Sequence, residues 1–204
     1  MSHVSDAIKE RRSIRKYSTN PVPQEAIEEV LVAAGWAPSA HNAQPWRFIV
    51  LADPAVKREL AEAMAEAWAA DMAQDGSKVD VETQKARVER FATAPVLILA
   101  CTTMDGMARQ PDMERLSVER DLALQSLAAA LENMLLTAHA EGLGACWFCA
   151  PAFCKETVRK VLGIPADVEP QALIAMGYPA EAPPVPTKNR LGDFCFKDKW
   201  GGKF

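Results

Sequence analysis

The stretch APVLILAC (residues 94–101) decides the fold, because it is a continuous apolar run of the length of one strand. A strand that is apolar at every position is typical of the centre of a sheet whose two faces are both covered. Three more segments have strand composition: WRFIVL (46–51), GACWFCA (144–150) and part of EPQALIAMGYP (169–179). We therefore predict a small sheet of four strands with residues 94–101 in its interior.

Helical patterns fill most of the sequence between these strands. A short helix is expected over 5–11, and another begins near Pro23, since proline is favoured in the first turn of a helix. This second helix has a core-facing stripe and a possible stop at Gly35; the stripe is Ile27, Val30, Leu31 and Ala34. A third helix opens with Asp53 as its N-cap and Pro54 at its first position.

The remaining helices are longer or follow the later strands. Helical composition continues to about Phe91 with an interruption at 74–78, and further helices are predicted over 117–141 and 151–162, with 103–116 as loop. So much helix around so few strands indicates an α+β fold in a single domain, residues 1–204. The tail from Tyr178 to Phe204 has little helical pattern, and such a tail can wrap a second subunit.

Composition and charge exclude several classes of protein. The net charge is −4, with an isoelectric point near 5.5, which argues against nucleic acid or an anionic membrane as a partner. No apolar stretch approaches the roughly 18 residues that a transmembrane helix needs. The first ten residues lack the apolar core of a signal peptide, so we expect a cytoplasmic protein with five free cysteines.

Three arginines and a serine stand together in RRSIR (11–15). Arginine forks, a hydroxyl and backbone N–H groups are the donors that hold a phosphate. The same five residues can equally form a solvated turn, and the motif alone does not decide. Lys188 and Arg190, in PTKNR (186–190), make a second cationic pair that either closes the same anion site or lies on the surface.

The segment APSAHNAQPW (37–46) combines small side chains with amide and hydroxyl groups. Small side chains let a flat ligand approach the backbone, and Asn42 and Gln44 offer donors and acceptors for the edge of a heterocycle. An ordinary loop with Asx-turn chemistry would have the same composition. Both interpretations stay open at this point.

Three cysteines lie in GLGACWFCAPAFC (142–154). The two glycines do not make a dinucleotide fingerprint, because G-x-G-x-x-G is incomplete and precedes a strand. Cys146, Cys149 and Cys154, with Cys195, could ligate zinc or an iron–sulfur cluster. However, Cys146 and Cys149 fall on opposite faces of the predicted strand, which favours structural thiols and no metal.

No catalytic motif of the protein's own is present. His3, His41 and His139 have no partner at catalytic spacing, and the nucleophile-elbow, zinc-protease and P-loop motifs are absent. If the protein is an enzyme, a bound organic cofactor therefore carries the chemistry, and no side chain is expected to be catalytic.

The order of these motifs resembles the FMN-dependent nitroreductase family. The resemblance covers about residues 4–200 and is tightest at RRSIRKYSTNPVP (11–23) and AAGWAPSAHNAQPWRFIVL (33–51). It implies a nitroreductase-like α+β fold, with a central, mostly antiparallel sheet between helices. It further implies an intertwined homodimer with two FMN sites and a tail that extends over the partner.

The resemblance also assigns site residues. Arg11 and Ser13 match the phosphate ligands, Arg15 matches the residue at the N1/O2 edge of the flavin, and Arg12 has no settled role. Residues Phe148, Cys149 and Ala150 match the strand end whose backbone reaches N5 and O4, although FCAP departs from the glycine that is common there. The other matching positions are Pro38, Ser39, Ala40, Asn42 and Gln44 of the partner's loop, and the phosphate pair Lys188 and Arg190.

The activity implied is hydride transfer from NADH or NADPH through FMN to an electron-poor acceptor, such as a nitroaromatic compound or a quinone, by a ping-pong mechanism. Trp147, Phe148 and the region 64–116 are expected to shape the acceptor pocket. Three alternatives remain: a biosynthetic relative that fragments flavin or serves a deazaflavin cofactor, a flavin store or sensor, and a cysteine-ligated metal protein.

Overall fold

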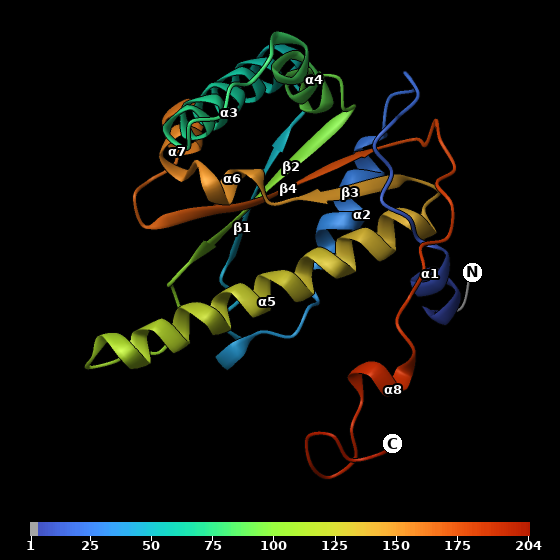
Figure 1. The fold of residues 1–204 in the computed structure, drawn as a ribbon, viewed down its shortest axis with the longest axis vertical. Coiled ribbons are helices and arrows are strands. Elements are labelled where there is room, and N and C mark those ends of the chain that lie inside the picture. The colour runs from blue at the N-terminus through green and yellow to red at the C-terminus, as the bar shows by residue number, and fades with distance from the viewer. Residues whose placement is uncertain (1–3) are drawn as a thin grey trace.

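A four-stranded sheet forms the centre of the computed structural model, which describes residues 4–204 (Figure 1). The strand order is β1-β2-β4-β3, and each neighbouring pair is antiparallel. The predicted antiparallel α+β architecture is therefore confirmed. The strands are β1 (Trp46–Leu51), β2 (Val96–Thr103), β3 (Gly144–Phe148) and β4 (Val168–Gly177).

Strand β2 is buried along its whole length, as its apolar sequence predicts. Its side chains alternate between two separate cores: Val96, Ile98 and Ala100 face one, and Leu97 and Leu99 face the other. Burying a side chain of this size contributes roughly 1.5–3 kcal/mol. A polar residue at any of these positions would destabilise one of the two cores, which explains the continuous apolar run.

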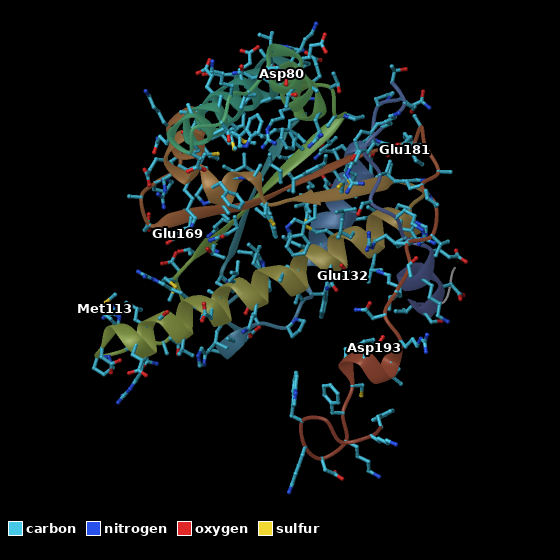
Figure 2. The ribbon with its side chains drawn as sticks, viewed as in Figure 1. Asp80, Met113, Glu132, Glu169, Glu181 and Asp193 are labelled. Carbon is cyan, nitrogen blue, oxygen red and sulfur yellow. The ribbon has the colours of Figure 1, made fainter. Side chains whose placement is uncertain are left out.

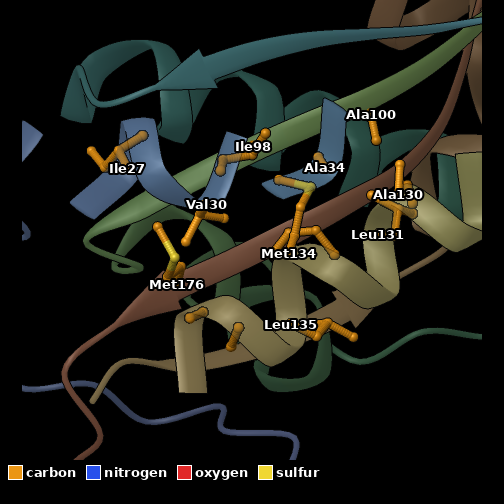
Figure 3. Packing of buried hydrophobic residues seen from close by; sticks show 14 of the residues in the cluster. Ile27, Val30, Ala34, Ile98, Ala100, Ala130, Leu131, Met134, Leu135 and Met176 are labelled. Atoms are coloured by element: carbon orange, nitrogen blue, oxygen red, sulfur yellow. The ribbon is translucent and has the colours of Figure 1, made fainter. Parts of the chain in front are cut away.

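Helices α2 (Gln24–Gly35) and α5 (Met113–Ala140) cover one face of the sheet. Figure 3 shows the contact between them, where Val30 and Ala34 of α2 lie against Leu131 and Met134 of α5 above Ile98 of β2. Helix α5 has 28 residues and is therefore about 42 Å long. It crosses the whole sheet, so residues far apart on α5 contact different ends of the molecule.

The other face is covered by α3 (Pro54–Gln74), α4 (Val81–Ala92), α6 (Ala150–Phe153) and α7 (Lys155–Leu162). Asp53 caps α3 as predicted, since its carboxylate accepts the N–H of Ala55 at 2.7 Å. The expected interruption at 74–78 separates α3 from α4, which Asp80 caps through the N–H of Thr83 at 2.8 Å.

Three predicted boundaries were wrong. The long helix begins at Met113 instead of 117, because Asp112 accepts the N–H of Arg115 and caps it there. The strand predicted over 144–150 ends at Phe148, since Pro151 fits the first turn of α6. The helix predicted over 151–162 is two helices that meet at Cys154.

The chain ends lie beside and beyond the edge strand β3. Helix α1 (Val4–Glu10) precedes the arginine segment, and the tail after β4 leads to the short helix α8 (Leu191–Phe194) and projects from the sheet (Figure 1). Trp200 and Phe204 on this tail are exposed. Of the helices described here, none is both long and apolar enough to span a membrane.

Candidate flavin site

The arginine segment 11–17 is attached to the edge strand β3 by its backbone. The N–H of Ile14 donates to the carbonyl of Ala145 at 3.0 Å, and Ser13 forms a parallel bridge with Ala145. The Tyr17 hydroxyl lies 2.6 Å from the carbonyl oxygen of Ile14 and 3.0 Å from that of Ala175. Burial raises the pKa of Tyr17 well above its ordinary value, so this hydroxyl keeps its proton and remains a donor.

Gly144 allows this attachment. A Cβ atom at Gly144 would lie 2.7 Å from the Cβ atom of Ile14, closer than two carbon atoms can approach. The glycine of GLGAC therefore serves the close approach of another segment to a strand. This close approach explains why the sequence has glycine there without a nucleotide fingerprint.

The three arginines of RRSIR have different surroundings. The Nε atom of Arg11 is buried and has no hydrogen-bond partner among the described residues; its nearest anion is Glu132 of α5, at 3.9 Å (Figure 2). Arg12 instead donates to the carbonyls of Lys9 and Arg11, at 2.6 and 2.8 Å. Arg15 donates from Nη1 to the Ser13 carbonyl, and its backbone N–H is held by Glu181 at 2.7 Å.

Arg11, Ser13 and Arg15 converge on β3 near Cys146. Burial raises the pKa of the Cys146 thiol, and the charges of Arg15, Arg90 and Arg11 oppose that rise. Arg90 was not among the predicted site residues, because it occupies an ordinary exposed helix position on α4. Its guanidinium carbon lies 6.0 Å from the centre of the Phe148 ring, so α4 brings a further cation to the strand end.

The strand end 148–150 closes one side of this region. Phe148 packs edge-on against Phe91 at 5.1 Å, Cys149 is exposed, and Ala150 begins α6. The neighbouring Trp147 has a buried indole N–H without a partner among the described residues. Two buried donors therefore lack a partner among the described residues: Arg11 Nε, beside the start of β3, and Trp147 Nε1, near its end.

The loop 38–44 lies elsewhere, against the first half of α5. Its backbone is held by side chains: the N–H of Ala40 donates to Ser126 Oγ, and that of Gln44 donates to Ser39 Oγ, both at 3.1 Å. Pro38, Asn42 and Gln44 are exposed. His41 also contacts α5, through Glu119. Glu119 is 13 positions from Glu132, the residue beside Arg11, so the two carboxylates are about 20 Å apart along the helix. One chain therefore does not bring this loop to Arg11.

Lys188 and Arg190 are exposed on the tail and are not brought to Arg11 either. The hollow around Arg11 has a volume of about 440 Å³, and the tail contributes to it only as far as Pro183. Figure 2 shows Asp193 of α8 well away from Glu181. Of the predicted residues, one chain thus gathers the arginine segment and the strand end, and leaves the loop and the late cations apart.

A second hollow, of about 450 Å³, lies between α3, α4 and α6. Its walls are apolar, and Ala150 joins it to the strand end. Arg87 stacks on Trp68 at its rim, with 3.8 Å from the guanidinium carbon to the ring centre. The lining includes Met64, Trp68, Met72, Phe91 and Phe153, four of which fall in the region 64–116.

All five cysteines are free thiols. Cys146 is buried in β3 while Cys149 is exposed beyond the end of that strand, so the alternation argued from a longer strand does not apply to Cys149. Within residues 4–204, no group of three or more histidine, cysteine or acidic side chains is arranged to hold a metal ion. Burial raises the pKa of Cys101 to about 12, so this thiol stays protonated.

Comparison with known proteins identifies the family. Residues 8–178 match the Nitroreductase family. The chain belongs to the nitroreductase family. Among its relatives is a protein of Methanothermobacter thermautotrophicus named as an NADH dehydrogenase/NAD(P)H nitroreductase, which is 36% identical over 182 residues, 88% of this chain and 79% of the relative.

Two solved structures of similar fold contain or are named for flavin. A nitroreductase from Desulfovibrio desulfuricans in complex with FMN has a TM-score of 0.72 and 29% identity, with 98% of each chain covered. A BluB-like flavoprotein from Clostridium difficile has a TM-score of 0.79 and 25% identity, covering 98% of this chain and all of the other. The nitroreductase family membership makes this chain an oxidoreductase and confirms the resemblance seen in the sequence.

Proposed function

We propose that this protein is an FMN-dependent oxidoreductase that uses NADH or NADPH to reduce an electron-poor acceptor. The observation that carries the proposal is the buried Nε of Arg11, which has no partner among the described residues and whose side chain lines a hollow at the start of β3. A buried donor without an acceptor is costly. A phosphate group would supply the missing acceptor, and the donors present fit it.

Residues of one chain would bind different parts of the flavin. Arg11 and Ser13 would hold the phosphate, because a guanidinium and a hydroxyl both donate to phosphate oxygens. Arg15 would hold the edge of the ring that gains negative charge on reduction, where a fixed cation lowers the cost of reduction. Backbone N–H groups of residues 148–150 would orient the ring. Arg12 uses its Nη1 for the carbonyls of Lys9 and Arg11, so we assign it no contact with FMN.

A second copy of the chain would complete the site. The loop 38–44 contacts α5 at Ser126 and Glu119, about 9 and 20 Å along the helix from Glu132, and the cations of the tail lie apart from Arg11. We therefore infer a homodimer in which Pro38, Ser39, Ala40, Asn42 and Gln44 of one copy contact the flavin of the other, and the tail brings Lys188 and Arg190 to the phosphate. The exposed aromatic residues of the tail favour such a contact.

When bound, FMN supplies the hydride-accepting centre through which electrons pass from NADH or NADPH to the acceptor. Because donor and acceptor would use one place in turn, the kinetics should be ping-pong. The apolar hollow between α3, α4 and α6 reaches Ala150, so we assign it to the acceptor. Its aromatic and methionine lining suits a flat aromatic molecule, such as a nitroaromatic compound or a quinone.

The absorption spectrum of the purified protein tests the proposal first. Flavin bands that bleach when NADH or NADPH is added without oxygen, and return with a quinone, are the expected result. A colourless protein that does not take up added FMN would contradict it. Bands that NAD(P)H leaves unchanged, combined with consumption of free reduced flavin in air, would instead identify a biosynthetic relative.

The conditions that keep five thiols free are those of the cytoplasm, where we expect the enzyme to act.

A further inference from the structure

Glu119 is a buried carboxylate that joins two loops. Only 5% of its surface is exposed, although it lies in the first half of α5. Its oxygens accept the backbone N–H of Ala108 at 3.3 Å and the side-chain amide of Gln110 at 3.0 Å. Its third contact is with Nε2 of His41, at 3.3 Å. One side chain therefore connects the loop that precedes α5 to the loop 38–44.

The loop 38–44 has a backbone that needs such support. His41, Asn42 and Gln44 have φ angles of 57°, 53° and 49°, in the left-handed region that residues other than glycine rarely adopt. A run of such conformations persists only where the surroundings hold it in place. Each of these three residues lies within the stretch to which contact with the partner's flavin is assigned.

The loop before α5 supports the same stretch by packing. A Cβ atom at Gly106 would lie 3.3 Å from the Cβ atom of Ala43, so the two loops are in close contact. Arg47 and Asp105 form a further link at 3.3 Å. These contacts lie on the surface, whereas Glu119 is buried below both loops. Glu119 is thus the buried side chain that joins the two loops.

We propose that Glu119 is a positioning residue, which acts through His41 to keep residues 38–44 in the shape that contacts the partner subunit's flavin. This inference rests on the proposed function. The His41 side chain contacts Glu119, so it links α5 to the loop 38–44. Glu119 touches neither cofactor nor acceptor.

Two substitutions test the link. Glu119→Gln removes the charge at nearly constant size. His41→Asn keeps a residue that tolerates the left-handed backbone but shortens the side chain. Because each change removes a hydrogen bond to a charged group that supports the loop, each should raise the Kd for FMN about tenfold. His41→Gln retains a donor of similar reach and should restore most of the affinity.

The double variant decides whether the two residues act together. FMN would be titrated into the apoprotein of each variant, and the visible circular dichroism of the bound flavin recorded at saturation. If Glu119 acts through His41, the double variant should bind FMN no more weakly than the weaker single variant. The flavin dichroism should change in both singles, while the far-ultraviolet spectrum stays that of the wild type.

A matched control is Glu169→Gln, which removes the charge that Lys155 pairs with at 2.7 Å and none of the hydrogen bonds of the loop 38–44, and should leave FMN affinity within twofold. Losses that multiply in the double variant, or single variants that bind FMN like the wild type, would overturn the inference alone. A wild-type protein that binds no FMN would overturn the proposed function as well, so the two failures are distinguishable.

Discussion

The arginine segment 11–17 and the loop 38–44 are both short, irregular and polar, yet they are held in different ways. The segment is joined to the sheet by main-chain hydrogen bonds, from Ile14 to Ala145 and from Ser18 to Tyr178, and the Glu181 side chain adds to them. The loop is fixed by side chains of α5, namely Ser126 and Glu119. The position of the first therefore follows from the edge of the sheet. The shape of the second depends on individual side chains, so substitutions should affect the two regions differently.

The largest effect is expected where the segment crosses the sheet edge. Gly144→Ala places a Cβ atom 2.7 Å from that of Ile14, so either β3 or the segment must move. Overpacking of this kind costs about 1–3 kcal/mol of unfolding free energy. Because Arg11 and Arg15 flank Ile14, FMN affinity should fall with stability. Thermal unfolding and FMN titration measure both.

Gly35→Ala is the control, since a Cβ atom there would meet nothing within 4 Å. It should leave both quantities unchanged. A Gly144→Ala protein that melts like the wild type and binds FMN equally would show that the edge contact does not fix the segment.

Arg11→Ala should cost less stability and still release FMN. Its guanidinium has only a long pairing with Glu132, a side chain that is about half exposed, so folding loses little. Removing one charged donor from a phosphate shell costs on the order of 1.5–3 kcal/mol, or about ten- to a hundredfold in Kd. The yellow occupancy of the purified variant gives a first reading, and titration of the apoprotein gives the Kd.

Arg12→Ala is the matched comparison, because Arg12 lines the same hollow but its Nη1 already donates to the Lys9 and Arg11 carbonyls. It should keep its FMN. Equal losses in the two variants would mean that RRSIR acts as a diffuse positive charge, and full occupancy in Arg11→Ala would refute the phosphate assignment.

Ser126→Ala should have a smaller effect, confined to the loop. The N–H of Ala40 loses its acceptor, and one neutral hydrogen bond is worth about 1 kcal/mol, or roughly a fivefold rise in Kd for FMN. Asn133→Ala removes another α5 side-chain bond, to Ala33 of α2, and should leave FMN binding unchanged. If both variants weaken FMN equally, the loop does not depend on Ser126 in particular.

The same contrast explains how far the sequence could predict the molecule. Local rules were sufficient for β1, β2, the cap at Asp53 and the end of α2 at Gly35, because burial period and helix termini depend on a few neighbouring residues. The helix start at Met113 was missed although Asp112 is a usual N-cap residue, since the loop-like composition before it hid the signal.

Contacts between distant segments were outside the reach of such rules. Nothing near Gly144 in the sequence indicates that Ile14 will lie against it, and nothing near Glu119 indicates His41. The arginine segment was found because several cations stand together, whereas Arg90 stands alone on a polar helix face. The family resemblance predicted which residues belong to one site, and the fold shows which contacts hold them in place.

The smallest expected effect is a difference in pH dependence between the hydrogen bonds of Glu119 and those of the arginine segment. Hydrogen bonds from Gln110 and Ala108, with the nearby His41, hold the pKa of Glu119 below its usual range of about 4.3. A lowered pKa in the native state means that the bond to Ala108 is intact above pH 4.3 and is lost as the pH falls through the lower native value. The Ile14 amide donates to a carbonyl that does not titrate. Amide exchange should therefore give a constant ratio of Ala108 to Ile14 protection factors from pH 7 to 5, which falls at lower pH. In Glu119→Gln the ratio should be low already at pH 7 or independent of pH; a wild-type ratio that never changes would mean that a group other than Glu119 fixes the loop before α5.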